Sequence, residues 1–353
     1  MESWFSKGLT KWYKQNKRDL PWRSETDPYK IWLSEIILQQ TQVAQGTSYY
    51  LKFIAKYPKA GNLASANEDE VLKLWQGLGY YSRARNLHAT AKIIKSNYAG
   101  VFPSTYEEIR ALKGIGDYTA SAISSFAYNL PFAVVDGNVY RLLSRLFGID
   151  TPIDSGVGKK EFQALANELL DKKNPAEHNQ AIMEFGSQFC KPNNPDCENC
   201  IFNSKCLAFK TNRVKELPIK SKKIKISNRF LNYVVIVDKN NNVLLNKRAE
   251  SDIWKGLYEF YLIESKKEIS IDKLFKTPEF NKIATSKFKL LHSSKNYKHI
   301  LSHQHLYAKF YVIKAASIIS NTLTTSKINN LNNFAFSRLT EKFLNDCDLK
   351  EIV

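Results

Sequence analysis

The sequence lacks any apolar segment long enough to cross a membrane, and its N-terminus lacks the apolar core of a signal peptide. The longest apolar runs, such as residues 233–237, have only the length of a β-strand. We therefore expect a soluble intracellular protein. A chain of 353 residues is long enough to bury more than one core, so two or three domains are expected.

Cysteine is scarce, and most of it is clustered. Four of the five cysteines lie between Cys190 and Cys206, whereas Cys347 stands alone and is interpreted as a small apolar residue. A reducing compartment disfavours disulfides, so the clustered cysteines are better candidates for metal ligands.

Acidic residues are also few relative to basic ones. The 34 Asp and Glu residues face 52 Lys and Arg residues, which gives a formal net charge of +18. This excess favours a polyanionic partner, nucleic acid before an anionic membrane, because phosphate contacts release condensed counterions. Charge alone leaves open a generally basic protein without such a partner.

The character of the chain changes near residue 212. Up to about residue 210, apolar residues recur at helical spacing, and we find no internal repeat of fixed period. Residues 212–229 are rich in lysine and poor in large apolar residues, which indicates a basic linker. Residues 230–263 alternate apolar runs with polar turns, and a further strand and a final helix are expected at 305–313 and 337–345. The sequence therefore predicts an all-α part followed by an α+β domain.

The cysteine run has a spacing of six, two and five residues between Cys190, Cys197, Cys200 and Cys206. Four thiolates in one short loop are suitable ligands for either a [4Fe-4S] cluster or a structural zinc ion. Zinc sites usually use two tight Cys-Cys or His-His pairs, and only Cys197 and Cys200 form one here. The spacing therefore favours iron–sulfur over zinc, with a disulfide least favoured.

Two glycines separate a pair of expected helices. Residues 104–108 have the residue types that begin one helix, and Asp117 begins the next, directly after Gly114 and Gly116. Glycines there would allow a tight turn and bring backbone amides close to a phosphate. An ordinary turn remains the alternative.

Two carboxylates stand in unusual surroundings. Asp136 follows the apolar residues 131–135 at the expected start of a helix, where an N-cap role is the plain alternative. Glu35 has bulky apolar neighbours on both sides, and periodicity alone leaves open a paired core or surface glutamate. In a dry pocket, burial would raise the pKa of Glu35 and make it a general acid.

Several motifs together resemble one family. These are WLSEIILQQTQV, WQGLGYYSRARNL, LKGIGDYTA and VVDGNVYR, followed by the cysteine run and a Nudix-like C-terminal part. This order resembles the MutY family of adenine DNA glycosylases, within the helix-hairpin-helix superfamily that includes endonuclease III. The resemblance implies an all-α helix-hairpin-helix glycosylase with a [4Fe-4S] cluster loop and a smaller α+β Nudix-like domain. It implies a six-helix domain at 21–131, a cluster domain at 1–20 and 132–211, the basic linker, and a lesion-recognition domain at 230–353.

The activity implied is base excision repair by a monofunctional glycosylase. It would flip adenine out of DNA opposite 8-oxoguanine or guanine and hydrolyse the N-glycosidic bond. Glu35 matches the acid that protonates adenine N7, and Asp136 matches the carboxylate that stabilises the oxocarbenium-like sugar. Tyr118 and Asn138 match residues that support catalysis near the sugar.

Further residues of this sequence match site residues of the family. For each of them, a role in packing or capping is the alternative to a role in binding. Arg23 and Gln180 match residues that contact the extruded adenine, and Gln40 and Tyr80 match residues beside 8-oxoguanine. Bifunctional relatives place lysine at the position of Tyr118, and some members place one at the position of Tyr140. Because both lysines are missing, we expect negligible strand cleavage.

The C-terminal part departs from its expected pattern twice. It has no glutamate-rich Nudix motif after Gly256, so we expect no nucleotide hydrolysis. The family's Phe-Ser-His loop reads Leu301-Ser302-His303, so Ser302 and His303 can still donate hydrogen bonds to 8-oxoguanine while the aromatic group is gone. The neighbouring histidines leave a metal site as a weaker alternative.

The expected partner is double-stranded DNA, bound by a monomer in the bacterial cytoplasm at the nucleoid. Two alternatives remain: an endonuclease III-like enzyme for oxidised pyrimidines, and a DNA-binding protein without catalysis. Tyr118 and the extra domain disfavour the first, and the presence of Glu35 and Asp136 disfavours the second.

Overall fold

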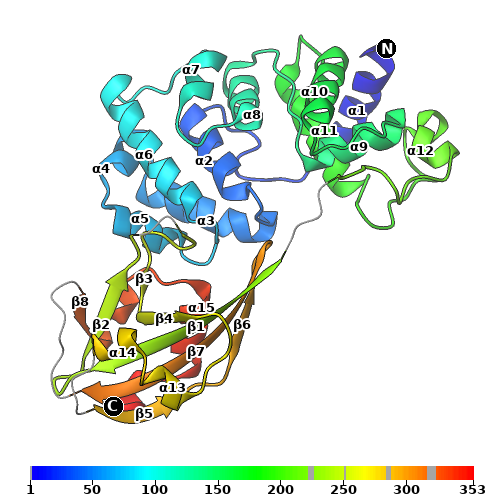
Figure 1. The fold of residues 1–353 in the computed structure, drawn as a ribbon. Helices are drawn as coiled ribbons and strands as arrows, with labels where there is room; N and C mark the ends of the chain where they lie inside the picture. The colour runs from blue at the N-terminus through cyan, green and yellow to red at the C-terminus, as the bar shows by residue number, and fades with distance from the viewer. Residues whose placement is uncertain (1, 222–225, 250–251, 284–287, 316–322) are drawn as a thin grey trace. The chain divides into compact units, whose positions relative to one another are not determined.

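The computed structural model describes residues 2–221, 226–249, 252–283, 288–315 and 323–353. By its internal contacts the chain divides into two compact units (Figure 1). Unit 1 comprises Met1–Ser65 and Asn86–Lys223, and unit 2 comprises Ala66–Arg85 and Ile224–Val353. Among the described residues, no helix is both long and apolar enough to span a bilayer.

Unit 1 is built from helices and has no strand among its described residues, which confirms the prediction for this part of the chain. Its elements are α1 (Glu2–Asn16), α2 (Pro28–Leu38), α3 (Val43–Lys56), α4 (Ala60–Ser65), α6 (Ser82–Asn97, from residue 86), α7 (Tyr106–Ala111), α8 (Asp117–Tyr128), α9 (Gly137–Phe147), α10 (Gly156–Leu169), α11 (Pro175–Gln188), the 3-10 helix η1 (Asn203–Lys205) and α12 (Leu207–Lys210).

Helix α2 passes through the interior of unit 1. Asp27 caps its N-terminus by accepting a hydrogen bond from the Tyr29 amide, and Pro28 occupies the first turn, where a missing amide hydrogen costs nothing. All residues from Ile31 to Ile37 are buried, so this helix is covered on every side. Helix α8 packs against it.

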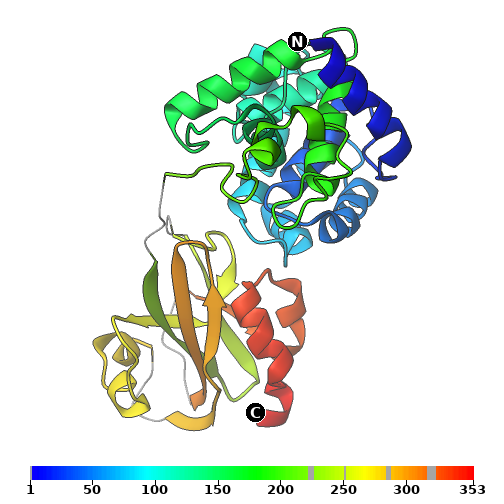
Figure 2. The ribbon, with the colours of Figure 1, turned by 90° about the vertical axis from the view of Figure 1, so that its right-hand side faces the viewer.

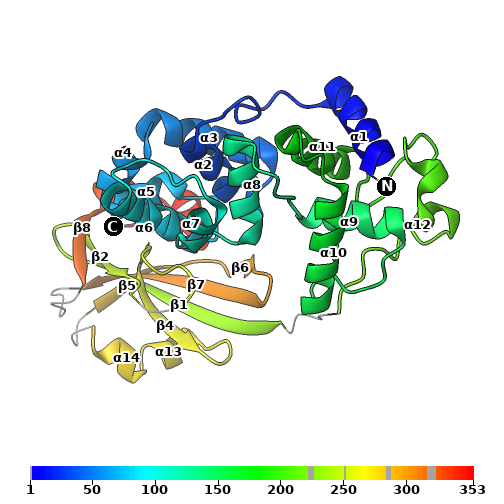
Figure 3. The same cartoon turned by 90° about the horizontal axis from the view of Figure 1, so that it is seen from above.

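Helix α9 has a single apolar face. Val139, Leu142, Leu143 and Leu146 are buried at the spacing of successive helical turns. They form one core with residues of α1, α10 and α11. Figure 3 shows α1 lying beside α11, which brings the first helix next to a segment about 170 residues later in the chain.

Unit 2 contains a β-sheet with helices on its faces, which confirms the predicted α+β character. Its elements are α5 (Glu68–Trp75), β1 (Ser227–Val237), β2 (Asn242–Lys247), β3 (Tyr258–Glu259), β4 (Tyr261–Ser265), α13 (Ile271–Leu274), α14 (Pro278–Asn281), β5 (Phe288–Ser293), β6 (Tyr297–Ile300), β7 (Gln304–Ala315), β8 (Thr324–Lys327), the 3-10 helix η2 (Ile328–Asn333), α15 (Arg338–Asp346) and α16 (Leu349–Ile352).

The sheet has the order β3-β2-β1-β7-β5, with β4 beside β1, β6 beside β7 and β8 beside β2. Strands β1 and β7 pair in parallel from Ser227 with Gln304 to Val237 with Lys314, and the other pairs are antiparallel. One face packs on α15 and α16, and the other on α13 and α14 (Figure 2). Strand β1 begins within the predicted linker 212–229, of which residues 222–225 lie outside the described structure.

Residues 66–85, which the sequence analysis assigned to the helical domain at 21–131, are grouped by their contacts with the C-terminal part. Within unit 2, the Asp69 carboxylate accepts hydrogen bonds from Lys247 at 2.5 Å and from the Tyr258 hydroxyl at 3.0 Å. Gln76 donates to Glu341 at 2.5 Å. The loop that follows α5 is therefore anchored on the C-terminal part.

Candidate active site and cysteine loop

A cavity of about 420 Å³ opens in unit 1 between α2, α8, α9, α11 and the two chain segments around residues 18–23 and 39–43. The residues predicted for catalysis or adenine contact all line it, together with one residue predicted to lie beside 8-oxoguanine: Arg23, Glu35, Gln40, Tyr118, Asp136, Asn138 and Gln180. Residues far apart in the sequence thus share one polar site.

Glu35 is a buried carboxyl group, because α2 is enclosed on all sides and leaves this side chain 7% exposed. The Tyr118 hydroxyl donates a hydrogen bond to its Oε2 at 2.8 Å. Burial raises the pKa of Glu35 to about 7, and the Asp136 charge also raises it, whereas the Tyr118 hydrogen bond and the Arg23 charge lower it. A group of this kind holds and releases a proton near neutral pH.

Asp136 caps the N-terminus of α9. Its Oδ1 accepts hydrogen bonds from the amides of Asn138 at 2.9 Å and Val139 at 2.8 Å, and its Oδ2 accepts one from the Asn138 side chain at 2.8 Å. Burial raises the pKa of Asp136 above its ordinary value, although these hydrogen bonds oppose the shift. The N-cap alternative and a role in the cavity are therefore compatible.

Asn138 is held by a buried arginine. Arg141 donates to Asn138 Oδ1 at 2.9 Å, to the Gly186 carbonyl at 2.6 Å and to the Cys190 carbonyl at 2.7 Å. A Cβ atom on Gly186 would lie 2.8 Å from the Asn138 carbonyl oxygen, so only glycine lets α11 approach α9 this closely. The amide of Asn138 is thereby fixed toward Asp136.

Ion pairs at the cavity wall were not predicted from the sequence. Glu184 on α11 has a fully buried side chain, which accepts two hydrogen bonds from the Arg18 guanidinium at 2.6 and 2.8 Å and a further one from Arg23. Burial alone would raise the pKa of Glu184, but the two arginines bring it below its ordinary value. Its position four residues after Gln180, on the same helix face, was the available signal.

Two other predicted residues take distinct positions. The Gln180 side chain accepts a hydrogen bond from the Tyr13 hydroxyl at 2.6 Å and donates to the Arg23 carbonyl at 3.4 Å. Gln40 is exposed at the cavity edge and has a left-handed backbone with φ of 54°. Such a conformation is uncommon for a residue other than glycine and favours a functional site.

The predicted glycine hairpin joins α7 and α8. Gly114 has φ of 79°, and a Cβ atom there would lie 2.7 Å from the Asn86 Cβ, so this position requires glycine. Gly116 caps α8 with φ of −95°, and a Cβ atom there would meet nothing within 4 Å. The tight turn thus rests on Gly114 alone, whereas Gly116 leaves the helix N-terminus open to solvent.

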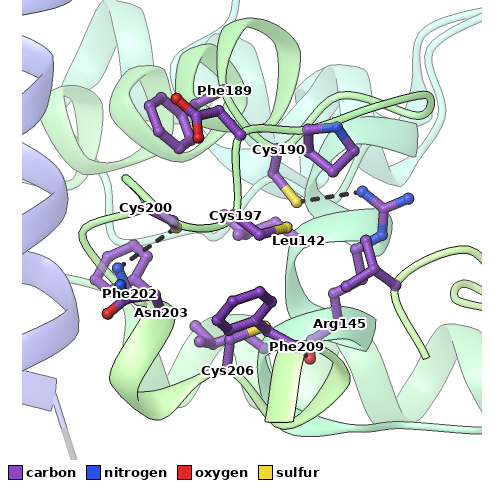
Figure 4. A pocket seen from close by; sticks show the side chains of 14 residues that line it. Leu142, Arg145, Phe189, Cys190, Cys197, Cys200, Phe202, Asn203, Cys206 and Phe209 are labelled. Carbon is purple, nitrogen blue, oxygen red and sulfur yellow. Dashed lines mark hydrogen bonds between the residues drawn. The ribbon is translucent and has the colours of Figure 1, made fainter. Parts of the chain in front are cut away.

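The four clustered cysteines surround one pocket (Figure 4). Its remaining walls include Leu142, Phe202 and Phe209. Arg145 donates a hydrogen bond to the Cys190 Sγ at 3.5 Å, and the Phe202 amide donates to the Cys200 Sγ at 3.4 Å. Hydrogen-bond donors aimed at sulfur in an apolar pocket are suitable for stabilising thiolate ligands.

Three thiols of this pocket have raised pKa values. Burial raises the pKa of Cys200 to about 12, and burial and the neighbouring sulfurs raise those of Cys197 and Cys206 as well. Within the described ranges, no group of three or more His, Cys, Asp or Glu side chains is arranged to hold a single metal ion. Cys347 lies elsewhere, buried in the core of unit 2.

The residues predicted for 8-oxoguanine contact in unit 2 are exposed. Tyr80 follows α5, and Ser302 and His303 form the turn between β6 and β7, where the Ser302 Oγ and the His303 Nδ1 lie 3.3 Å apart. Leu301 instead packs against the core of unit 2. The residue that departs from the Phe-Ser-His pattern is therefore an anchor of the turn.

Family models match both parts of the chain. Residues 33–171 match the HhH-GPD superfamily of base excision DNA repair proteins, and residues 232–346 match the NUDIX domain. A solved thermostable thymine-DNA glycosylase is similar with a TM-score of 0.55 and 28% identity, over 59% of this chain and 95% of that one. The helical glycosylase fold followed by a Nudix-like domain is thus established.

Curated relatives match beyond these domains. The adenine DNA glycosylase of Buchnera aphidicola subsp. Baizongia pistaciae is 35% identical over 93% of this chain and 92% of its own length. The adenine DNA glycosylase of Mus musculus is 42% identical over 58% of this chain and 42% of its own length. On this similarity, and with the predicted residues gathered in one cavity, the chain belongs to the adenine DNA glycosylase family.

Proposed function

We propose that this protein removes adenine mispaired with 8-oxoguanine or guanine from double-stranded DNA, as a step of base excision repair at the bacterial nucleoid. The observation that carries the proposal is the buried Glu35, with a pKa near 7, in the same cavity as Asp136. A proton donor and a carboxylate in one cavity are the two groups that cleavage of a glycosidic bond requires.

The reaction begins with base flipping, because stacked duplex DNA hides the bond from a cavity inside the protein. Glu35 donates its proton to N7 of the extruded adenine, and the bond between N9 and the sugar C1′ breaks with its electron pair going to the base. Asp136 stabilises the positive charge that develops on the sugar. Water then adds its oxygen to C1′ and gives up a proton, which leaves an abasic site.

Arg23 and Gln180 supply the polar groups for adenine recognition. A base presents both donors and acceptors on its edge, and these two side chains offer both kinds at the cavity wall. The buried Glu184 accepts hydrogen bonds from Arg18 and Arg23 and thereby fixes the Arg23 guanidinium in the wall.

The enzyme is monofunctional in this proposal. Strand cleavage by relatives needs an amine that attacks the sugar and forms a Schiff base. Tyr118 has no amine, and burial together with the nearby carboxylates raises its pKa well above the ordinary value, so it stays a neutral hydrogen-bond donor to Glu35. Asn138 orients Asp136 by its side-chain hydrogen bond.

In this proposal, residues at the cavity edge and outside the cavity contact the opposite base and the DNA backbone. Gln40, Tyr80, Ser302 and His303 are the residues we assign to 8-oxoguanine, and their exposure is compatible with that role. The open helix N-terminus at Gly116, next to Gly114, offers backbone amides to a phosphate of a DNA molecule bound by one monomer.

The cysteine pocket fits a [4Fe-4S] cluster held by Cys190, Cys197, Cys200 and Cys206. Arg145 and the Phe202 amide donate hydrogen bonds to the sulfurs of Cys190 and Cys200, and only Cys197 and Cys200 form the close pair that zinc sites usually repeat. A bound cluster would supply iron for these thiolates and so offset the raised pKa of Cys200. It would serve as a structural centre for the loop between α11 and α12.

The test is a single-turnover assay with purified holoprotein and duplexes that carry adenine opposite 8-oxoguanine, adenine opposite guanine, thymine opposite guanine, or thymine glycol. We expect adenine release from the first two, fastest opposite 8-oxoguanine, with strands intact until alkali is added. Release of thymine or thymine glycol alone would refute the proposal. Tight binding without release of any base would instead indicate a DNA-binding protein.

A further inference from the structure

The loop between α5 and α6 has an unusual backbone. Gly77, Gly79 and Tyr80 have φ values of 99°, 73° and 47°, all in the left-handed region. For Tyr80, which has a Cβ atom, this conformation costs about 1 kcal/mol or more. Its side chain is nonetheless 56% exposed, so burial of the ring does not compensate for the cost.

Arg83 contacts this loop at several points. Its guanidinium carbon lies 5.1 Å from the centre of the Trp75 ring and 5.6 Å from that of the Tyr80 ring. Its Nη2 faces the carbonyl oxygens of Leu78 at 3.4 Å and Gly79 at 3.3 Å. One planar cation therefore contacts the exposed ring and the backbone directly before it.

Hydrogen bonds fix the inner side of the loop between α5 and α6. Trp75 is fully buried, and its indole Nε1 donates a hydrogen bond to the Gly79 carbonyl at 3.0 Å. The Tyr81 hydroxyl accepts a hydrogen bond from the Gly77 amide at 3.3 Å and faces the Phe336 carbonyl at 3.4 Å, within unit 2. Arg83 thus joins a fixed ring on one side to an exposed ring on the other.

We propose that Arg83 is a positioning residue for Tyr80, which holds the tyrosine ring outward in the orientation needed to enter DNA beside the mispair. This rests on the proposed function, in which Tyr80 contacts 8-oxoguanine. The side chain of Arg83 acts through Tyr80 and does not bind a phosphate, because the residue is only 8% exposed. A preset ring enters the duplex without first having to be ordered, which favours insertion next to the lesion.

If Arg83 positions Tyr80, the two residues should act together on the preference for 8-oxoguanine. Arg83→Met keeps the length of the side chain but removes the planar cation, and Arg83→Lys keeps the charge but removes the plane. We expect either variant to lower the preference for adenine opposite 8-oxoguanine over adenine opposite guanine, by about tenfold for Arg83→Met, as does Tyr80→Ala. The double variant Tyr80→Ala/Arg83→Met should match Tyr80→Ala alone. Additive losses, or an unchanged preference in both Arg83 variants, would overturn the proposal.

The matched control is Arg85→Met. Arg85 lies on the same helix and donates to the Lys255 carbonyl, so its loss should leave the preference unchanged. Thermal unfolding of each variant detects a merely structural role. An Arg83→Met protein that lost stability and released adenine more slowly from both mispairs by the same factor would contradict the positioning role. If that variant does not fold, Arg83→Lys serves the same comparison.

A second readout does not depend on excision. 2-Aminopurine placed next to 8-oxoguanine becomes more fluorescent when a side chain unstacks it. We expect the wild-type holoprotein and Arg85→Met to increase this fluorescence, and Tyr80→Ala and Arg83→Met not to. If adenine release failed in the wild type while this pattern held, the proposed function would be wrong and the positioning role would stand. An equal increase with Arg83→Met would overturn the positioning role alone.

Discussion

Glu35 has a pKa of about 7 because burial on α2 destabilises its ionised carboxylate. The same burial acts on Asp136, but the amides at the start of α9 favour its ionised form. Backbone hydrogen bonds thus oppose the effect of burial on the pKa of Asp136, whereas the Tyr118 hydroxyl and the Arg23 charge oppose it at Glu35. In the proposed mechanism Glu35 donates a proton while Asp136 stabilises positive charge.

The pH dependence of excision follows from these two groups. The protonated fraction of Glu35 falls as pH rises through about 7, so the single-turnover rate should fall on that side. On the acidic side the rate should fall as Asp136 becomes protonated, at a pH above its ordinary pKa of 3.8. A buffer series with rapid quenching measures both limbs, and a rate that rose through pH 8 would be incompatible with Glu35 as the acid.

Tyr118→Phe is the matched variant for this profile. The Tyr118 hydroxyl lowers the pKa of Glu35 by donating to its carboxylate, so removing the hydroxyl should raise that pKa. The alkaline limb should then move to higher pH. A limb that stays in place would assign it to another group.

At this scale the sequence predicted the residues in local motifs and missed those defined by packing. Glu35 and Asp136 stand in segments whose apolar neighbours mark them as unusual. Arg18 and Glu184 are separated by 166 residues and meet only because α1 packs on α11. No local pattern could predict that pair, although the position of Glu184 four residues after Gln180 indicates that both lie on the same face of α11.

In the hairpin between α7 and α8, the two glycines have different structural roles. Gly114 is needed for a left-handed turn against Asn86, whereas Gly116 has an ordinary backbone conformation and open space. The sequence predicted both glycines as one feature. Only the dihedral angles and the neighbouring side chain distinguish them.

Alanine substitutions at the two glycines should therefore change different properties of the protein. Gly114→Ala should lower the free energy of unfolding by about 1–2 kcal/mol because of the left-handed backbone, and more where Asn86 cannot move. Gly116→Ala should leave stability nearly unchanged but weaken binding of undamaged duplex, because the new methyl group stands where a phosphate would approach. Denaturant unfolding and fluorescence anisotropy measure the two quantities. Equal stability of the two variants would contradict the strained turn.

The cysteine loop makes a separate prediction at the same scale. Metal analysis of purified protein should find about four irons per chain and little zinc. Cys200→Ser should lose most of the iron, while Cys347→Ser, which alters the core of unit 2, should retain it. Stoichiometric zinc in the wild type would reverse the assignment.

The turn between β6 and β7 shows why the sequence was less informative in unit 2. The motif predicted the position of Ser302 and His303, but the direction of Leu301 depends on strand register, because neighbouring residues of a strand face opposite sides. Tyr297 and His299 lie more inward on β6, and Leu301 continues that side. The missing aromatic ring is therefore replaced by an apolar anchor.

In the whole molecule, the residues proposed for chemistry and those proposed for lesion recognition lie in different units. The cavity with Glu35 and Asp136 lies entirely in unit 1, whereas Tyr80, Ser302 and His303 lie in unit 2. The net charge of +18 supports binding to DNA without selecting a base. Chemistry and lesion recognition should then respond to different substitutions.

The double variant Ser302→Ala/His303→Ala tests that division. Two lost hydrogen bonds of about 1 kcal/mol each should reduce the preference for 8-oxoguanine over guanine by about 30-fold. The rate with adenine opposite guanine should change little, since the cavity is intact. Competition between the two duplexes measures the preference, and a parallel loss on both substrates would show that the turn does not read the lesion.

The central claim is that buried Glu35 is the acid that releases adenine, and Glu35→Gln tests it most directly. This substitution keeps the size of the side chain and removes its acidic proton. Single-turnover release of adenine opposite 8-oxoguanine should fall about a thousandfold or more, while binding of the same duplex stays close to that of the wild type. Release at the wild-type rate by a folded, iron-loaded Glu35→Gln protein would contradict the account.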